Sequence, residues 1–370
     1  MPAEGFTFGT NRMAMISTAT EIDIQRVKQS RLPETDLANP KFGRVFTDHM
    51  LVWDFADGTW QRPRIMPFQD LELSPATLVL HYAQTIFEGM KAYRSQQGDV
   101  SLFRPQANIA RMNRSAKRMC MPALPEDAFL HGLKELVRMD GGWLPSGEDG
   151  SLYIRPFMFA NDEYIGVKPS EGYRFMIFIS PVRAYYQEPL RVKLELEYSR
   201  AFPGGTGEVK CGGNYAGGLY PSKMGQDEGY HQQLWTDAME HKYIEESGTM
   251  NVFFIIDGVL TTPSLDGTIL PGITRDSILT IAKDKGMPVA ERKVTVDEVV
   301  AGLCNGKVSA AFGAGTAATI APIKVIAYKG EDLELPDLGA DSEVHRLGRM
   351  LDDIRKGRTP DKYGWVVHVS

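Results

Sequence analysis

The chain has 370 residues, more than the roughly 250–300 at which a single hydrophobic core stops growing. Apolar residues make up 43% of it and charged residues 24%, a balance that is ordinary for a globular protein and excludes extended disorder. The formal net charge of −6 provides no general attraction for nucleic acid or for an anionic membrane surface. The length therefore predicts about two globular domains.

The cysteines and the first residues bear on the cellular compartment. Cys120, Cys211 and Cys304 are far apart and form no Cys-x-x-Cys pair, so neither a disulfide framework nor a metal site is indicated. Reduced thiols are typical of a cytoplasmic protein, which is the location we expect. Residues 1–20 contain one basic residue and no long apolar run, so we expect no secretory signal. No apolar run reaches the roughly 18 residues of a membrane span.

The first half of the chain begins with a polar arm, residues 1–40, that contains scattered prolines. Alternating apolar residues between 42 and 68, with a turn at 56–58, predict a hairpin. Further elements follow from apolar spacing and turn residues: a helix beginning near 76, strands at 90–93 and 100–103, helices at 107–121 and 125–140, and strands at 152–159 and 173–182.

Four basic side chains lie on the helix predicted at 107–121, away from its apolar positions: Arg111, Arg114, Lys117 and Arg118. The pattern alone favours a solvated helix face for each of them. A polar stretch, 183–189, ends in proline at mid-chain and predicts an interdomain linker. A second α/β region follows, with strands near 191–199, 232–237, 250–256 and 308–312 and helices near 275–285 and 343–356.

One lysine of the second region lies among glycines. Lys210 falls in the segment 202–215, which contains five glycines but lacks the Gly-Lys-Ser/Thr of a phosphate-binding P-loop. Desolvation between apolar and glycine neighbours would lower the pKa of this lysine and make it a nucleophile. A flexible surface loop with an incidental lysine explains the segment equally well.

Two adjacent carboxylates precede a very apolar strand at 250–256. If the strand pattern extends back, either Glu245 or Glu246 points inward, where a buried carboxylate needs a cationic or protonated partner. The spacing alone favours an exposed strand edge instead.

Two glycine turns suit an anion. Gly272, Ile273 and Thr274 begin a predicted helix, where free N–H groups and the helix dipole favour a phosphate, although a simple capped surface helix is common. The turn at 311–319 resembles a dinucleotide fingerprint only weakly, because Pro322 interrupts any following helix, and it suits a phosphate or carboxylate near Thr316. A nucleophilic lysine, a buried carboxylate and two anion-binding turns together fit pyridoxal phosphate.

Seven motifs in order give a more specific indication. They are Phe-Gly-Arg-Val-Phe-Thr-Asp-His-Met ending at Met50, Phe-Glu-Gly-Met-Lys-Ala-Tyr at Tyr93, Tyr-Ile-Arg-Pro at Pro156, Gly-Gly-Thr-Gly-Glu-Val-Lys-Cys-Gly-Gly-Asn-Tyr at Tyr215, Glu-Ser-Gly-Thr-Met-Asn at Asn251, Leu-Pro-Gly-Ile-Thr-Arg at Arg275, and Gly-Thr-Ala-Ala at Ala318. Together they closely resemble the branched-chain amino acid aminotransferases, from about residue 40 to the C-terminus.

The resemblance implies a fold and a division of the chain. The fold class is α/β (α+β), namely fold-type IV of the pyridoxal-phosphate enzymes, with a barrel-like core in the larger domain. We expect an N-terminal arm at 1–40, a small domain with substrate-pocket residues at 41–180, a linker at 181–190, and a large cofactor-binding domain at 191–370. The resemblance also implies a homodimer whose subunits share each pocket.

The resemblance further implies the site residues. Lys210 resembles the Schiff-base lysine that also moves the proton, and Glu246, rather than Glu245, resembles the partner of the pyridine nitrogen. The remaining cofactor contacts implied are Tyr215, Arg111, Ile273, Thr274 and Thr316, which changes the expectation of a solvated Arg111. The substrate contacts implied are Phe42, Tyr82, Phe87, Tyr153, Arg155, Tyr185, Thr249 and Ala317.

The implied activity is transfer of the amino group between leucine, isoleucine or valine and 2-oxoglutarate, by a ping-pong mechanism. Within the same fold, the alternatives are a D-amino acid aminotransferase and an aminodeoxychorismate lyase, whose chains are usually shorter. Outside enzymes, the alternative is a non-catalytic module that binds phosphate or nucleotide at the same glycine turns. A yellow colour that borohydride bleaches would distinguish the enzyme from such a module.

Overall fold

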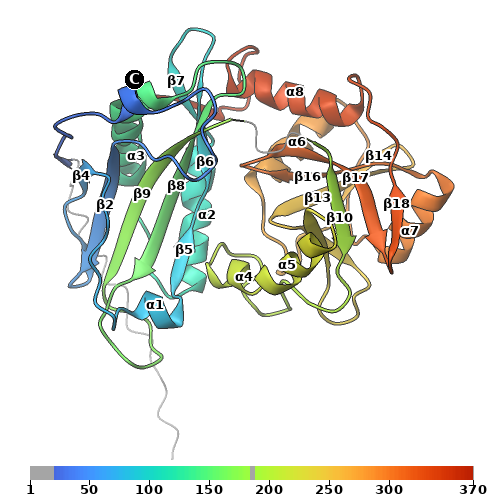
Figure 1. The fold of residues 1–370 in the computed structure, drawn as a ribbon, viewed down its shortest axis with the longest axis horizontal. Helices are drawn as coiled ribbons and strands as arrows, with labels where there is room; N and C mark the ends of the chain where they lie inside the picture. The colour runs from blue at the N-terminus through green and yellow to red at the C-terminus, as the bar shows by residue number, and fades with distance from the viewer. Residues whose placement is uncertain (1–20, 184–187, 370) are drawn as a thin grey trace, which may run out of the picture.

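The protein is described by a computed structural model that covers residues 21–183 and 188–369. Two large sheets lie side by side, one formed mainly by the first half of the chain and the other by the second (Figure 1). The helices are α1 (Leu78–Tyr82), α2 (Pro105–Arg118), α3 (Glu126–Asp140), α4 (Gly213–Ala216), α5 (Leu219–Asp227), α6 (Ile273–Asp284), α7 (Val296–Asn305) and α8 (Glu343–Arg355), with short 3-10 turns at Leu32–Glu34 and Gly141–Trp143.

The first sheet is mostly antiparallel and follows the order β1-β4-β2-β9-β8-β6-β7-β19, with β3 and β5 paired at its side. Its central strands are the longest, because their apolar residues pack against α2 and α3 in one core. The strands are β1 (Asp23–Ile24), β2 (His49–Ala56), β3 (Thr59–Trp60), β4 (Arg64–Pro67), β5 (Thr85–Phe87), β6 (Met90–Arg94), β7 (Val100–Phe103), β8 (Ser151–Ala160), β9 (Tyr173–Val182) and β19 (Val366–His368).

The second sheet contains a closed barrel. Its order begins β12-β11-β10-β17-β16-β13, and β12 also pairs with β13, which closes a ring of six strands. The strands are β10 (Leu190–Leu194), β11 (Gln232–Thr236), β12 (Ile244–Ser247), β13 (Met250–Ile256), β14 (Val259–Thr262), β15 (Val289–Glu291), β16 (Val308–Gly315), β17 (Thr319–Tyr328) and β18 (Glu331–Glu334). Closure removes the exposed strand edges of the ring.

Strand β13 shows why this region forms a barrel with outer helices. All seven of its residues are buried, since the strand has a core on each face. Val252, Phe254 and Ile256 belong to the cluster that α7 covers, whereas Phe253 and Ile255 belong to the cluster under α6 and α8. Burial on both faces explains the continuous apolar run in its sequence.

The two sheets are also connected at the end of the chain. Strand β19 pairs antiparallel with β7, so the last described residues return to the first sheet (Figure 1). The chain passes from the first sheet to the second between β9 and β10, after Val182 and before Leu190.

Most elements predicted from spacing are present, with boundaries shifted by a few residues. The helix expected from residue 76 is only the five-residue α1, because Ala83 takes a left-handed conformation and β5 begins at Thr85. The expectation of a solvated basic face on α2 holds for Arg114, Lys117 and Arg118, which are exposed, but is wrong for Arg111, which is buried. No helix within 21–183 or 188–369 is long and apolar enough to cross a membrane.

Candidate active site

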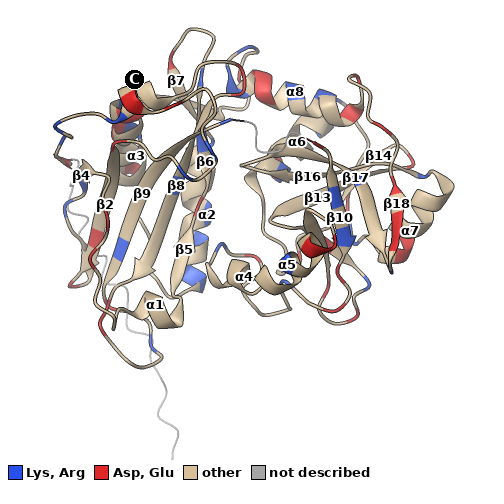
Figure 2. Cartoon of the chain, viewed as in Figure 1, with Lys and Arg blue, Asp and Glu red and all other residues tan. Residues whose placement is uncertain are grey.

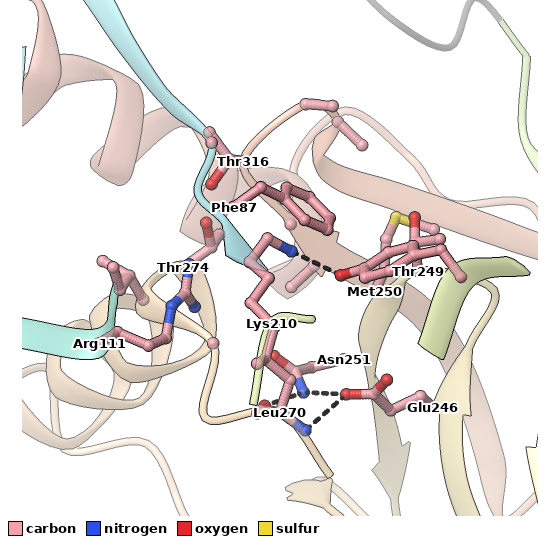
Figure 3. Close-up of a pocket in the computed structure, with 18 of the residues that line it drawn as sticks. Phe87, Arg111, Lys210, Glu246, Thr249, Met250, Asn251, Leu270, Thr274 and Thr316 are labelled. Carbon is pink, nitrogen blue, oxygen red and sulfur yellow. Dashed lines mark hydrogen bonds between the residues drawn. The ribbon is translucent and has the colours of Figure 1, made fainter. Parts of the chain in front are cut away.

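A cavity of about 430 Å³ lies between the two sheets and gathers most of the predicted site residues (Figure 3). The first sheet and its helix α2 contribute one wall, and the barrel with its turns contributes the other. Of the predicted residues, the following line it: Phe42, Phe87, Arg111, Tyr153, Arg155, Lys210, Tyr215, Glu246, Thr249, Ile273, Thr274, Thr316 and Ala317.

Lys210 is fixed through its backbone and faces the cavity through its side chain. Its N–H donates to the Ser115 hydroxyl at 3.0 Å, and its carbonyl accepts from the N–H of Phe87 at 3.0 Å. Burial, followed by the nearby Arg111 charge, lowers the pKa of Lys210 to about 8. About a tenth of the amine is therefore neutral at pH 7, far more than for an ordinary lysine, and the neutral form is the nucleophile. The alternative of a flexible loop with an incidental lysine is wrong.

Tyr215 lies beside the lysine amine. Lys210 Nζ is 2.6 Å from the Tyr215 hydroxyl, and the amine also faces the Phe87 ring at 4.6 Å from its centroid. Burial, with the charge of Glu246 as the next cause, raises the pKa of Tyr215, so the phenol stays protonated. A protonated phenol in this position is a hydrogen-bond donor toward an oxygen bound next to the amine.

Glu246 lies across the cavity on β12. Its Oε1 accepts from the backbone N–H of Leu270 at 3.0 Å and from Asn251 Nδ2 at 3.2 Å (Figure 3), and its Oε2 is 3.0 Å from Arg200 Nε. Burial raises the pKa of Glu246, while the positive charge of Arg200 opposes that shift. The carboxylate is thus held in one orientation at the cavity wall and is suited to a protonated ring nitrogen.

The neighbouring carboxylate does not line this cavity. Glu245 Oε1 accepts a hydrogen bond from the Thr268 hydroxyl at 2.5 Å, and the side chain faces a different, smaller cavity. Both glutamates are about 95% buried, so the expectation of an exposed strand edge is wrong. The strand alternation places one residue on each face, and only Glu246 faces the active-site cavity.

A cradle for an anion lies at the end of the cavity near α2 and α6. Helix α6 begins at Ile273 with no side-chain cap, so its first N–H groups are available beside Thr274. Gly272 is required there, because a Cβ at this position would collide with Asn251 Oδ1. Arg111 and Thr316 complete the cradle from the other side (Figure 3).

Arg111 is held by a carboxylate that the sequence did not single out. Its Nε and Nη2 donate to Glu88 at 2.7 and 2.8 Å, and both side chains are buried. Burial alone would raise the pKa of Glu88, but the charge and hydrogen bonds of Arg111, together with Lys210 and Asn108, outweigh it and lower the pKa. Nη1 of Arg111 also donates to the carbonyl of Pro271, which joins α2 to the cradle turn.

The substrate side of the cavity combines aromatic rings with one guanidinium. Arg155 lies 4.8 Å from the Phe87 ring and donates to the Tyr153 hydroxyl at 3.0 Å. Its Nε is buried without a hydrogen-bond partner, and no carboxylate of the described residues forms an ion pair with it. Phe42 contacts Tyr153 edge to face at 5.4 Å. This wall accepts apolar groups and one additional anion.

Two predicted substrate residues do not join the others. Tyr82 ends α1 on the surface, 42% exposed, and does not line the cavity of its own chain. Tyr185 lies outside the described residues. Tyr82 therefore contributes to a site only if another molecule approaches α1.

The sequence analysis missed three residues that orient the predicted ones. Glu88 pairs with Arg111, while Asn251 and Arg200 both contact Glu246. Glu88 and Asn251 lie within the motifs quoted above. A search of those motifs for a partner of a buried Arg111 or Glu246 would have identified them. Arg200 lies outside every motif and gave no comparable signal.

The family model of the class IV amino-transferases matches residues 85–326, and the chain belongs to that class. Branched-chain-amino-acid aminotransferase 2 of Bacillus subtilis is 44% identical over 345 residues, which are 92% of this chain and 95% of that one. The branched-chain-amino-acid aminotransferase of Mycolicibacterium smegmatis is 41% identical over 91% and 94% of the two chains. Within the class, the chain belongs to the branched-chain-amino-acid aminotransferase family.

Solved structures agree with this assignment. The branched-chain amino acid aminotransferase of Escherichia coli has a TM-score of 0.71 at 27% identity and covers 87% of this chain and 99% of its own. The branched-chain aminotransferase of Thermoproteus uzoniensis, solved with norvaline, has a TM-score of 0.71 at 25% identity over 87% and 100%. The fold is thus fold-type IV, and the cofactor of this class is pyridoxal 5'-phosphate.

Proposed function

We propose that this protein is a branched-chain-amino-acid transaminase that moves the amino group between leucine, isoleucine or valine and 2-oxoglutarate, forming branched 2-oxo acids and glutamate. The main support for the proposal is the environment of Lys210. Its side chain is half-buried, and its amine has a lowered pKa and faces a cavity that holds Glu246 on one wall and an anion cradle at one end. Relatives with 41–44% identity over most of the chain carry the same activity in their names.

The cavity residues fit pyridoxal phosphate. Bound there, the cofactor supplies an aldehyde for the amino group and a ring that accepts electrons from the substrate carbon. The cradle of Ile273, Thr274, Thr316 and Arg111 would hold its phosphate. Glu246 would hold the ring nitrogen in its protonated form, and Tyr215 would donate to the ring oxygen.

Lys210 has two proposed tasks. Its neutral amine would hold the cofactor before substrate binds, and the released amine would then take the Cα proton of the amino acid and deliver it to the cofactor carbon that the lysine had occupied. The Tyr215 hydroxyl, 2.6 Å from Nζ, orients the amine for this transfer. Because both half-reactions use one pocket in succession, the kinetics are ping-pong.

One pocket must accept two kinds of side chain. We propose that Phe42, Phe87 and Tyr153 contact the branched apolar side chains, and that Arg155 binds the γ-carboxylate of glutamate or 2-oxoglutarate. The unpartnered Nε of Arg155 supports this assignment, since a buried guanidinium without a carboxylate lacks its usual partner. Thr249 and Ala317 line the part of the cavity that we assign to the α-carboxylate.

We propose that a second copy of the chain completes the pocket, in a homodimer. Tyr82 lies outside the cavity of its own chain. It belongs to an exposed apolar surface formed by α1 and the loop between β8 and β9. Backbone hydrogen bonds join this loop to α1 and the residues just before it. The large apolar residues of this surface, 42–90% exposed, are Leu80, Tyr82, Tyr164, Ile165 and Val167. An apolar surface of this kind is typical of an interface.

We also propose that the chain is cytoplasmic and divides near residues 181–190. The three cysteines are unpaired, which supports a reducing compartment. The passage from the first sheet to the second between β9 and β10 supports the division. Tyr185, in this segment, remains a proposed contact of the substrate.

The proposed activity is tested by a panel of amino donors. Leucine, isoleucine, valine, aromatic and D-amino acids are each incubated with 2-oxoglutarate and the purified enzyme, and glutamate is measured. We expect glutamate with the three branched-chain L-amino acids. Glutamate from D-amino acids alone, or from none of the three, would contradict the proposal.

A further inference from the structure

A second cavity, of about 530 Å³, lies on the far side of the turn that bounds the active site. Ala317 and Ala318 line both cavities, so this turn is the wall between them. The opposite wall of the second cavity is formed by α8, which carries charges of both signs (Figure 2). None of the residues assigned to the reaction, apart from Ala317, lines the second cavity.

The second cavity contains a buried lysine amine with unused donors. Lys91 is 7% exposed, and its Nζ donates to the carbonyl of Ala317 at 2.8 Å. An ammonium group has three N–H donors, and no other acceptor or ion-pair partner of Nζ is present among the described residues. Burial, followed by the charge of Arg355, lowers the pKa of Lys91 to about 7. A buried amine with this surplus of donors lacks an anion.

The carboxylates of the cavity are already paired with other cations. Asp149 lies 2.5 Å from Arg183, and Asp352 lies 3.4 Å from Arg355 Nη1 and 3.8 Å from Lys356 Nζ. Arg355 is 2% exposed and lies directly behind the cavity, with its Nε unpartnered. Asp352, whose charge also acts on Lys91, is thus shared with Arg355 and Lys356.

The remaining lining combines polar residues, among them Ser151, Thr319 and His345, with an apolar part. Ala318, Ile320, Pro322 and Val344 form this apolar part, and Gly348 of α8 opens the cavity because it carries no side chain. We propose that this cavity binds a small organic carboxylate, whose charged group meets Lys91 Nζ and whose short carbon skeleton contacts these apolar residues. The apolar part of the lining favours an organic acid over inorganic phosphate, which would leave those residues hydrated.

An acid bound in the second cavity affects the active-site cavity through the turn that the two cavities share. Lys91 holds the Ala317 carbonyl on one side of the turn, and Thr316 belongs to the anion cradle on the other. A carboxylate that accepts from the remaining donors of Lys91 repositions the amine, and with it the hydrogen-bonded Ala317 carbonyl of the turn that lines the active site. We expect the bound acid to change the KM for the amino acid while the enzyme still turns over.

The test measures binding of 4-methylpentanoate to the holoenzyme by titration calorimetry. We expect two sites per chain, because this acid also fits the active site. Gly348→Leu fills the second cavity, since a Cβ at Gly348 meets only Ile320 at 3.7 Å and leaves the active site untouched. We expect this variant to lose at least about tenfold in affinity at one site, with the other unchanged.

Two controls separate filling of the cavity from general effects. Arg346→Leu places the same side chain on an exposed position of α8 outside the cavity, and it should bind like the wild type. Lys91→Met removes the amine and should lose the same site as Gly348→Leu. Retained binding at the active site reports that each variant is folded.

Three results would overturn the proposal. They are a single site in the wild type that Gly348→Leu leaves intact, two sites that Gly348→Leu and Lys91→Met leave intact, or a second site that takes inorganic phosphate but not 4-methylpentanoate. Because the measurement reads binding and not turnover, it stands even if the amino-donor panel shows another specificity.

Discussion

Two lysines, the half-buried Lys210 and the buried Lys91, lie on opposite sides of one turn, and desolvation lowers the pKa of both, to about 8 and about 7. Their surroundings differ. Lys210 faces a phenol, a fixed carboxylate and an anion cradle, whereas Lys91 donates to a backbone carbonyl beside apolar residues. A lowered pKa therefore does not identify a catalytic lysine in this fold. The groups that the amine faces do.

The largest difference in kinetic constants is expected between the variants that lack Lys210 and those that lack Lys91. Lys210→Ala removes the proton carrier and should lower kcat by roughly 10⁴-fold, the upper range for general acid–base catalysis. Lys91→Met removes one hydrogen bond to the turn and should lower kcat/KM by about tenfold at most. Steady-state kinetics with leucine and 2-oxoglutarate compare the two variants. Near-wild-type turnover by Lys210→Ala would contradict the assignment of Lys210 as the proton carrier.

The two adjacent glutamates give the next largest contrast. Glu246→Gln takes away the charge that we assign to the ring nitrogen and should lower kcat by about 10²–10³-fold, as for other preorganised electrostatic contacts. Glu245→Gln is the matched control, because Glu245 is equally buried but faces another cavity, and we expect little change. Equal losses of kcat in both variants would point to a structural role for the strand and not to Glu246 itself.

Substrate choice sharpens the contrast between the two walls of the active site. Arg155→Leu removes the only cation that we assign to the γ-carboxylate, and the KM for 2-oxoglutarate should rise by about 10–100-fold, the worth of a hydrogen bond to a charged group. The KM for leucine should stay within a few-fold, because the aromatic rings remain. A parallel rise in both KM values would argue against this role of Arg155.

The smallest effect concerns pH. Because the pKa of Lys210 is lowered from 10.5 to about 8, its neutral fraction increases as the pH rises through 8. The rate at which the apoenzyme takes up pyridoxal phosphate should therefore rise by about tenfold between pH 7 and pH 9 and then level off. Stopped-flow absorbance measures this rate. A rate that keeps rising to pH 10 would indicate an ordinary lysine pKa.

Much of the site followed from the sequence because its parts lie in short motifs. Lys210 lies among glycines and Gly272 begins a predicted helix, so local chemistry indicated both, whereas Tyr215 was implied only by the family resemblance. Arg111 and Glu246 did not follow from spacing alone, since charged residues on a helix or before a strand are usually exposed. Their burial depends on partners distant in the chain, Glu88 and Arg200.

In the fold as well, local features could be predicted from the sequence, whereas features that depend on distant partners could not. The runs of β8, β9 and β13 were visible in the sequence, whereas the ring closure between β12 and β13 and the return of β19 to β7 were not. Both are pairings between elements, which local periodicity does not specify. Lys91 carried no signal at all, because a lysine in an apolar strand does not indicate what its amine will face.

The central claim is that Lys210, and not Lys91, holds the cofactor. The holoenzyme is reduced with borohydride, which fixes the cofactor to the amine that holds it, then digested and mapped by mass spectrometry. We expect the phosphopyridoxyl group on the peptide that contains Lys210 and on no other. Its appearance on the peptide that contains Lys91, or on several lysines equally, would contradict the account.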